Sequence, residues 1–125
     1  MLPSDITLHR KTQQLELRYP GGVCHRLSAE LLRVHSPSAE VKGHGPGQEK
    51  LQSGKMHVAI TELIPVGNYA LQLVFSDGHD SGIYSWDYLY HLGEHEASLW
   101  RDYLAALDKA GASRDPDEQV VKFFG

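Results

Sequence analysis

The sequence has very little cysteine: Cys24 is the only one in 125 residues. A lone cysteine excludes an internal disulfide, and it excludes a zinc site or iron–sulfur cluster held by several thiolates of this chain alone. Any metal bound by this chain would therefore need histidines or carboxylates as ligands. Eight histidines are present, and they are scattered along the chain rather than consecutive.

The chain also lacks long apolar runs and clusters of basic residues. No stretch approaches the roughly 20 apolar residues needed to cross a bilayer, and residues 1–10 lack the basic region and apolar block of a secretory signal. We therefore expect a soluble, cytoplasmic protein with no membrane partner. The formal net charge is -4, from 12 Lys and Arg against 16 Asp and Glu, so we do not expect nucleic acid as a partner either.

Sequence motifs of catalysis are missing as well. There is no Gly-x-Ser-x-Gly sequence, and Cys24 lies in a predicted strand, so nucleophilic catalysis has no good candidate. The glycines at 43, 45 and 47 resemble a phosphate-binding loop, but Pro46 removes a backbone donor and no apolar strand precedes them. The sequence therefore predicts neither an enzyme nor a nucleotide site.

Alternating apolar and polar residues predict an α+β fold with two antiparallel β meanders. The first covers residues 6–27 and turns at Pro20-Gly21-Gly22, and the second covers residues 58–84 with a hairpin at Asp77-Gly78. Ser28 is predicted to cap a short helix after the third strand, ending near Val34.

Two C-terminal helices complete the predicted fold. The first begins after Ser85 and stops at Gly93, and the second carries apolar residues from Ala97 to Leu107 and ends at Gly111. Residues 1–112 are predicted to form a single domain, and residues 113–125 a flexible tail.

The segment 35–56 has no regular pattern, and loops of this length are commonly functional or disordered. If it folds back over the Asp77-Gly78 turn, four residues could converge as a site for iron or zinc: His35, His44, His79 and Asp80. This requires Gly78 to adopt a left-handed conformation that leaves His79 and Asp80 projecting from the sheet. The alternative is that each histidine caps, hydrogen-bonds or faces water.

Four segments carry a resemblance to a known family: LRVHSPSAEV at 32–41, GHG at 43–45, VGNY at 66–69 and FSDGHDSGIYSWDYL at 75–89. Together they resemble the gamma-butyrobetaine hydroxylase-like N-terminal domain family, over roughly residues 5–110. In that family the domain occurs alone in bacteria, in front of the oxygenase domain of carnitine-synthesis hydroxylases, and behind an ATPase of the iron–sulfur cluster carrier type. The catalytic iron ligands of the hydroxylases lie in the second domain, which this chain does not contain.

The resemblance also allows the zinc ligands of the family to be compared with the residues of this chain. The oxygenase relatives bind zinc in this domain through three closely spaced cysteines and a histidine. Aligned on Leu32-Arg33, the cysteine positions hold Ser36, Ser38 and Val41 here, and the histidine is similar to His79. Because only the histidine is kept, a structural zinc of that type is not expected.

Three functions are consistent with these observations. The first is a non-catalytic accessory or binding module of an iron-dependent or iron–sulfur system, with a protein partner and with Fe or Zn at the loop histidines. The second is a metal-free protein-interaction domain that binds its partner through the loop. The third is a small enzyme related to carnitine synthesis.

Overall fold

The structure is a computed structural model in which residues 1–121 are described. Its elements follow one another along the chain as β1 (Asp5–His9), β2 (Gln14–Arg18), β3 (Cys24–Ser28), α1 (Ala29–Val34), α2 (Ala39–Lys42), β4 (Ile60–Val66), β5 (Ala70–Phe75), β6 (Gly82–Ser85), α3 (Trp86–Glu94) and α4 (Glu96–Ala110). The predicted α+β fold is confirmed, with a short helix after the third strand and two helices at the C-terminal end.

Two three-stranded antiparallel sheets are present, in the order β1-β2-β3 and β4-β5-β6. In the first sheet Leu17 lies opposite both Ile6 and His25, and the alternation buries the Leu15 and Leu17 side chains completely. In the second sheet a bulge occurs between Ile60 and Glu62, where the predicted alternation is interrupted. Both predicted meanders are confirmed.

The hairpin between β5 and β6 begins with the predicted left-handed glycine. Gly78 has φ +89°, a conformation that strains any residue with a Cβ. Its N–H donates to the carbonyl of Phe75 at 3.1 Å, which closes the turn.

Serine side chains begin the helices as predicted. The Ser28 Oγ accepts from Leu31 N–H at 3.0 Å, and the Ser85 Oγ accepts from Tyr88 N–H at 3.1 Å. Helix α1 ends at Val34, and Gly111 ends α4 in the left-handed region with φ +67°.

The prediction that Gly93 ends a helix is wrong, because α3 continues through it to Glu94. The reason for a glycine at this position is packing rather than termination. A Cβ on residue 93 would lie 2.1 Å from the Nδ1 of His25, so the absence of a side chain lets β3 lie against α3.

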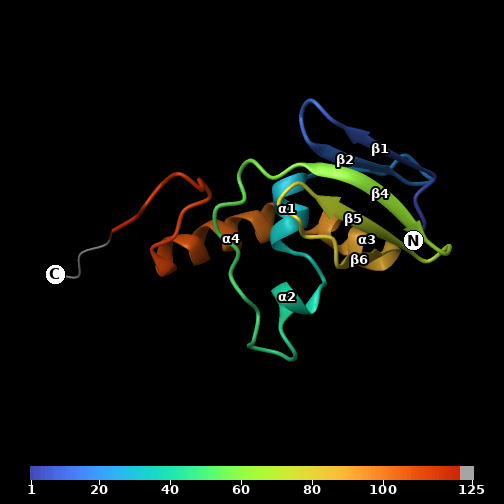
Figure 1. Ribbon diagram of the computed structural model, residues 1–125. Helices are drawn as coiled ribbons and strands as arrows, with labels where there is room; N and C mark the ends of the chain where they lie inside the picture. Colours follow the sequence, from blue (N-terminus) through green and yellow to red (C-terminus); the bar gives the residue numbers. More distant parts are fainter. Residues whose placement is uncertain (122–125) are drawn as a thin grey trace.

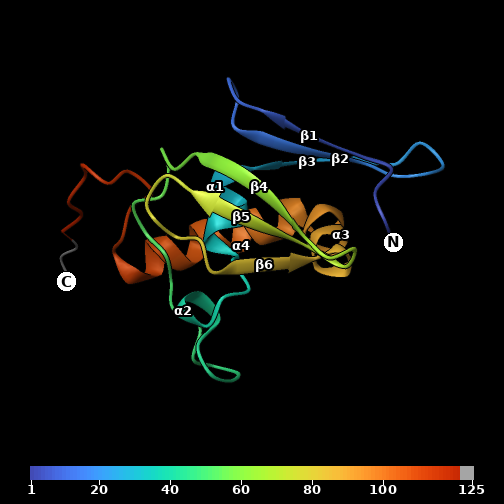
Figure 2. The same cartoon turned by 45° about the vertical axis from the view of Figure 1, so that its right-hand side comes forward.

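Figures 1 and 2 show the layers of the fold. Helices α1, α3 and α4 lie on one side of the β4-β5-β6 sheet, the β1-β2-β3 sheet lies beside β4, and α2 extends away from both sheets. The main core fills the space between the sheets and the helices, and its fully buried members include Leu17, Leu32, Leu73, Tyr84 and Leu89. Across residues 1–121, no helix has the length and apolar character required to cross a membrane.

The long segment 35–56 contains structure that the sequence pattern did not reveal. Helix α2 occupies part of it, with Ser38 as N-cap, and the Lys50 N–H donates to the Val41 carbonyl at 2.7 Å. The N–H groups of Gly54 and Met56 donate to carbonyls of Ser113 and Arg114, at 2.9 and 3.0 Å.

The segment predicted as a flexible tail is therefore bound to the domain at its start. Arg114 also pairs with the buried Glu30 through two hydrogen bonds of 2.8 and 2.9 Å. For the remainder of 113–121 the flexible tail stays a prediction, and residues 122–125 lie outside the described residues.

Candidate functional site

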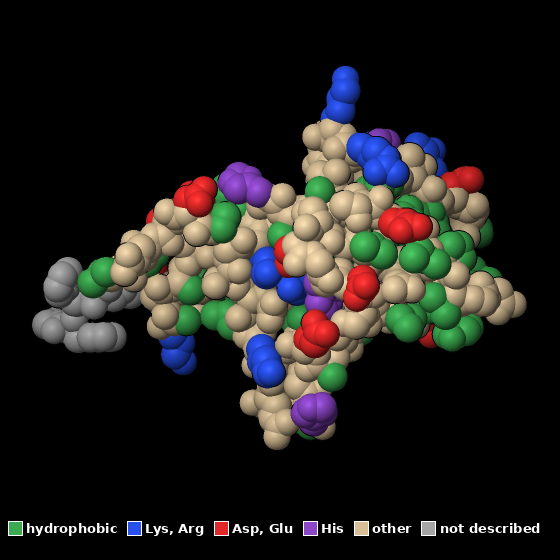
Figure 3. Space-filling model, viewed as in Figure 1, with side chains coloured by type: hydrophobic (Ala, Val, Ile, Leu, Met, Phe, Trp, Pro, Cys, Tyr) green, Lys and Arg blue, Asp and Glu red, His purple; other side chains and the backbone are tan. Residues whose placement is uncertain are grey.

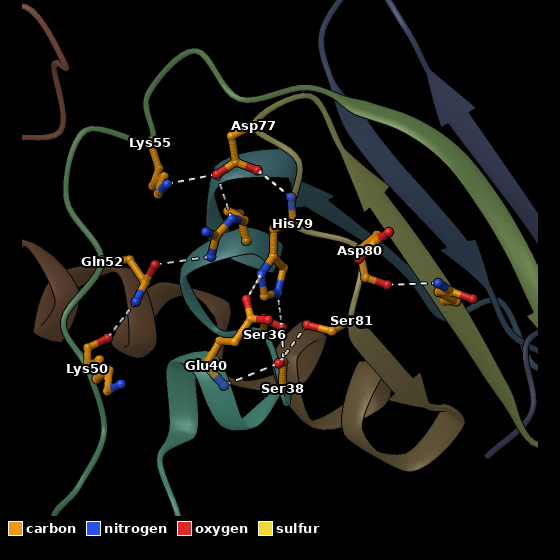
Figure 4. Close-up of polar contacts among 12 residues, drawn as sticks. Ser36, Ser38, Glu40, Lys50, Gln52, Lys55, Asp77, His79, Asp80 and Ser81 are labelled. Carbon is orange, nitrogen blue, oxygen red and sulfur yellow. Dashed lines mark hydrogen bonds and ion pairs between the residues drawn. The ribbon is translucent and has the colours of Figure 1, made fainter.

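His79 is the centre of a buried polar cluster. Its side chain is 2% exposed, and its two ring nitrogens lie 2.8 Å from the Ser36 Oγ and 3.1 Å from a carboxylate oxygen of Glu40 (Figure 4). A neutral imidazole that donates from Nδ1 to the Glu40 carboxylate accepts at Nε2 from the Ser36 hydroxyl. The predicted approach of His79 to the loop that begins at His35 is present, because Ser36 and Glu40 lie in that loop. The expectation of an exposed turn histidine is wrong, because the side chain is buried.

The order Ser36, His79, Glu40 is that of a nucleophile, a base and a group that orients the base. Catalysis also requires a substrate atom to reach the serine oxygen, and Ser36 has no exposed surface. A Cβ on Gly82 would lie 2.6 Å from that oxygen, so β6 packs directly over it. The cluster is therefore a structural connection between the 36–40 segment and the hairpin.

Three further contacts lie around this connection. The Ser38 and Ser81 hydroxyls lie 2.8 Å apart, and Asp77 accepts from Arg33 at 2.9 Å and from Lys55 at 2.7 Å (Figure 4). Burial raises the pKa of the Asp77 carboxyl, but hydrogen bonds from Lys55, the His79 backbone and Arg33 outweigh burial and lower it to about 2. The hairpin, α1 and the 52–55 segment are thus held together.

The other predicted metal ligands lie in different environments. His44 is exposed, and Asp80 is turned away from His79, with its backbone carbonyl accepting from Gln72 at 2.7 Å (Figure 4). His35 is half-buried beside Tyr103. Among residues 1–121, no group of three or more His, Cys, Asp or Glu side chains is arranged to hold a metal ion.

A cavity of about 430 Å³ lies between the 34–42 segment, the 49–52 segment, α3 and α4. Its wall is mainly apolar, with polar side chains interspersed. The lining residues are Val34, His35, Ser36, Val41, Lys42, Glu49, Lys50, Leu51, Gln52, Tyr88, His91, Leu92, Leu99, Asp102 and Tyr103.

Two tyrosines hold the walls of this cavity in place. The Tyr88 hydroxyl on α3 donates to the His35 carbonyl at 2.5 Å, and the Tyr103 hydroxyl on α4 donates to the Gln52 carbonyl at 2.7 Å. Each bond joins a helix to a segment without regular structure across the hollow. The cavity is therefore supported from both sides.

His35 contributes a polar side chain to the cavity wall. Burial, followed by the nearby charges of Lys42 and His91, lowers the pKa of His35 from 6.5 to about 4. Its ring meets Tyr103 edge to face, with the ring centroids 6.4 Å apart. At neutral pH His35 is uncharged and can either donate or accept a hydrogen bond.

The sequence patterns did not predict this cavity. Aromatic residues at helical spacing are usually core residues. The sequence around Tyr88 and Tyr103 does not show that these tyrosines line a cavity instead of filling the core. The resemblance had aligned Ser36 and His79 with zinc ligands, and it was the only indication that the two residues meet.

The fold agrees with the comparisons with known proteins. Residues 6–90 match the family described as gamma-butyrobetaine hydroxylase-like, N-terminal, and the chain belongs to that family. Among curated proteins, none is similar enough to count as a match.

Several solved structures are similar to this chain. One NMR solution structure is 54% identical and covers 98% of this chain and 97% of its own, with a TM-score of 0.83. A second is 48% identical over 99% of this chain and 93% of its own, with a TM-score of 0.78. A crystal structure from Acidithiobacillus ferrooxidans ATCC 23270, described as a protein with unknown function of the DUF971 family, is 38% identical over 73% of this chain and 91% of its own, with a TM-score of 0.62.

Proposed function

We propose that this protein is a non-catalytic binding module that takes a ligand in the cavity between the 34–42 segment and helices α3 and α4. The observation that supports this most directly is the cavity itself. Its volume of about 430 Å³ is in the range of small-molecule sites, roughly 300–1,000 Å³. An apolar wall with a few polar groups is also typical of such sites.

The two tyrosine hydrogen bonds support a site that exists before the ligand arrives. If the walls had to be ordered on binding, the entropy cost would reduce affinity. Here the bonds from Tyr88 to His35 and from Tyr103 to Gln52 already fix the walls. Ser36 is among the lining residues of the cavity, but it has no exposed surface and its hydroxyl is paired with His79, which supports a non-catalytic role.

The proposed role as an accessory of an iron-dependent or iron–sulfur system, with a protein partner, rests on the family resemblance. Its test is affinity capture by the tagged chain in its native cells, followed by iron analysis of the captured proteins. Recovery of an iron protein in proportion to the chain supports the role. Captured proteins that are free of iron contradict it.

Filling the cavity tests the binding proposal. Leu99 on α4 lines the cavity, so Leu99→Trp should occupy it, whereas Leu104→Trp on the same helix lies outside it and is 39% exposed. In a fragment screen by NMR, amides around the cavity should shift in the native protein and in Leu104→Trp, and not in Leu99→Trp. Fragments that bind all three proteins equally would contradict the proposal.

A second candidate is a metal-free protein-interaction domain. Hydrophobic side chains gather at one end of the β4-β5-β6 sheet (Figure 3), where Tyr69 is 62% and Ile83 is 48% exposed. Exposed apolar patches of this kind are a feature of protein-binding surfaces. If the partner binds here, Ile83→Lys should abolish its capture, and Leu99→Trp should leave capture unchanged.

A further inference from the structure

We propose that the ligand of this cavity is a small amphiphilic carboxylate, whose charged group lies by Lys42 and His91 and whose apolar part contacts Leu92 and Leu99. This inference rests on the proposed function of the cavity and adds the chemical class of the ligand.

The Lys42 ammonium and the His91 imidazole both contact Tyr88. The Lys42 ammonium lies 4.4 Å from the centroid of the Tyr88 ring, and the His91 ring stacks on the same tyrosine at 6.4 Å. Within residues 1–121 neither Lys42 nor His91 forms an ion pair with a carboxylate. An anion placed here would therefore meet positive charge that is not already neutralised.

His35 lines the same cavity, and its pKa is affected by the same two neighbours. Apart from burial, the groups that lower its pKa are Lys42 and His91, both of which disfavour a further positive charge. Of these groups, the Lys42 ammonium would attract a carboxylate for the same reason that it disfavours protonation of His35. The neutral imidazole can in addition donate a hydrogen bond to that carboxylate.

The acidic residues of the wall do not cancel this preference. Asp102 lies 3.5 Å from Arg101, its neighbour on α4, and both side chains are exposed. Glu49 is followed by Lys50, so this part of the wall carries one charge of each sign. The two lysines and the two carboxylates of the wall balance in number, so the positive charge that would meet an anion is local and lies at Lys42.

We expect the rest of the ligand to be apolar, because most of the remaining cavity wall is formed by apolar side chains. Val34, Val41, Leu92 and Leu99 come from four different helices and present aliphatic surface to the hollow. Burying methylene groups against such surface is favourable because it removes apolar area from water. A short aliphatic chain attached to a carboxylate matches both parts of the site.

Three probes with the same six-carbon chain separate charge from apolar contact: hexanoate, 1-hexanol and hexylammonium. Each is titrated into the full chain at pH 7, and the amide shifts of Lys42, Leu99 and Tyr103 are followed by NMR. We expect hexanoate to bind about tenfold more tightly than 1-hexanol, which equals roughly 1.4 kcal/mol, and hexylammonium to bind more weakly than both. Lys42→Gln should remove the preference for hexanoate, and Lys109→Gln, at the far end of α4, should keep it.

The outcomes distinguish the two proposals. Equal binding of hexanoate and 1-hexanol in the cavity would overturn the carboxylate and leave the proposed function intact. Absence of cavity binding by all three probes would contradict both. If an acidic peptide with one leucine binds in the cavity and hexanoate does not, the small-molecule ligand is wrong and the occupant is a peptide segment.

Discussion

Ser36 and His79 lie 43 residues apart in the sequence and meet through a hydrogen bond of 2.8 Å between Oγ and Nε2. This bond joins the segment after α1 to the β5-β6 hairpin, and the 36–42 part of that segment forms one wall of the cavity. The geometry of the cavity therefore depends on a contact beneath it.

Removing the imidazole should destabilise the protein. His79→Ala leaves the buried Ser36 hydroxyl without its partner and opens a hole beside Phe75, which together should cost about 2–3 kcal/mol. Urea denaturation measures this, with the exposed His44→Ala as a control within about 0.5 kcal/mol of the native protein. Equal stability of the two variants would show that the His79 contacts contribute nothing.

The close approach of β3 to α3 predicts an unusual response to Gly93→Ala. In an exposed helix this change stabilises by about 1 kcal/mol. Here the new Cβ would lie 2.1 Å from the His25 Nδ1, so we expect a loss of stability. Gly93→Ala combined with His25→Ala should be more stable than the sum of the two single changes indicates, because the second change removes the clash.

A control for this prediction is Gly45→Ala, because nothing lies within 4 Å of a Cβ at that position. Its stability should remain close to that of the native protein. If Gly93→Ala instead stabilises the domain in urea, the approach of His25 to α3 is not as close as described.

The sequence predicted the architecture better than it predicted the site. Alternation of apolar residues around Leu17 and Leu73, and caps such as Ser28, are local signals, and the elements they predicted are present. The position of His79 depends on partners 39 and 43 residues away, so its neighbours in the sequence suggested an exposed turn.

The same limitation applies to the cavity, which forms between segments that are distant in the chain. Tyr103 and Gln52, joined across it, are 51 residues apart. The periodicity of one helix cannot indicate whether a tyrosine will bond across a cavity or pack in the core. The prediction that Gly93 ends a helix was wrong for a related reason: in sequence, a glycine inside a helix cannot be told from a glycine that ends one.

Restoring thiolates should create a zinc site if the alignment with the zinc-binding relatives is correct. In the variant with Ser36→Cys, Ser38→Cys and Val41→Cys, three thiolates and His79 can surround one tetrahedral ion. We expect about one equivalent of zinc by elemental analysis, with thiolate and imidazole ligation seen in the cobalt spectrum. Adding His79→Ala should weaken binding, and a triple variant that binds no zinc would contradict the alignment.

The low pKa of His35 predicts a loss of stability in mild acid. Folding depresses this pKa from 6.5 to about 4, so the unfolded chain takes up the proton first as the pH falls. The free energy of unfolding is therefore not reduced by His35 above pH 6.5. It falls as the pH drops from 6.5 to about 4, by at most roughly 3 kcal/mol. Urea midpoints between pH 7.5 and 4.5 should fall less steeply for His35→Asn than for the native protein. Parallel curves would show that His35 titrates normally.

In our proposal the cavity between the 34–42 segment and helices α3 and α4 is the ligand site. The most direct measurement is the set of intermolecular NOEs between a bound short-chain ligand and the methyl groups of the protein. We predict NOEs to Val41, Leu92 and Leu99, which line the cavity. NOEs confined to Ile83 and other side chains on the exposed sheet face would contradict the claim.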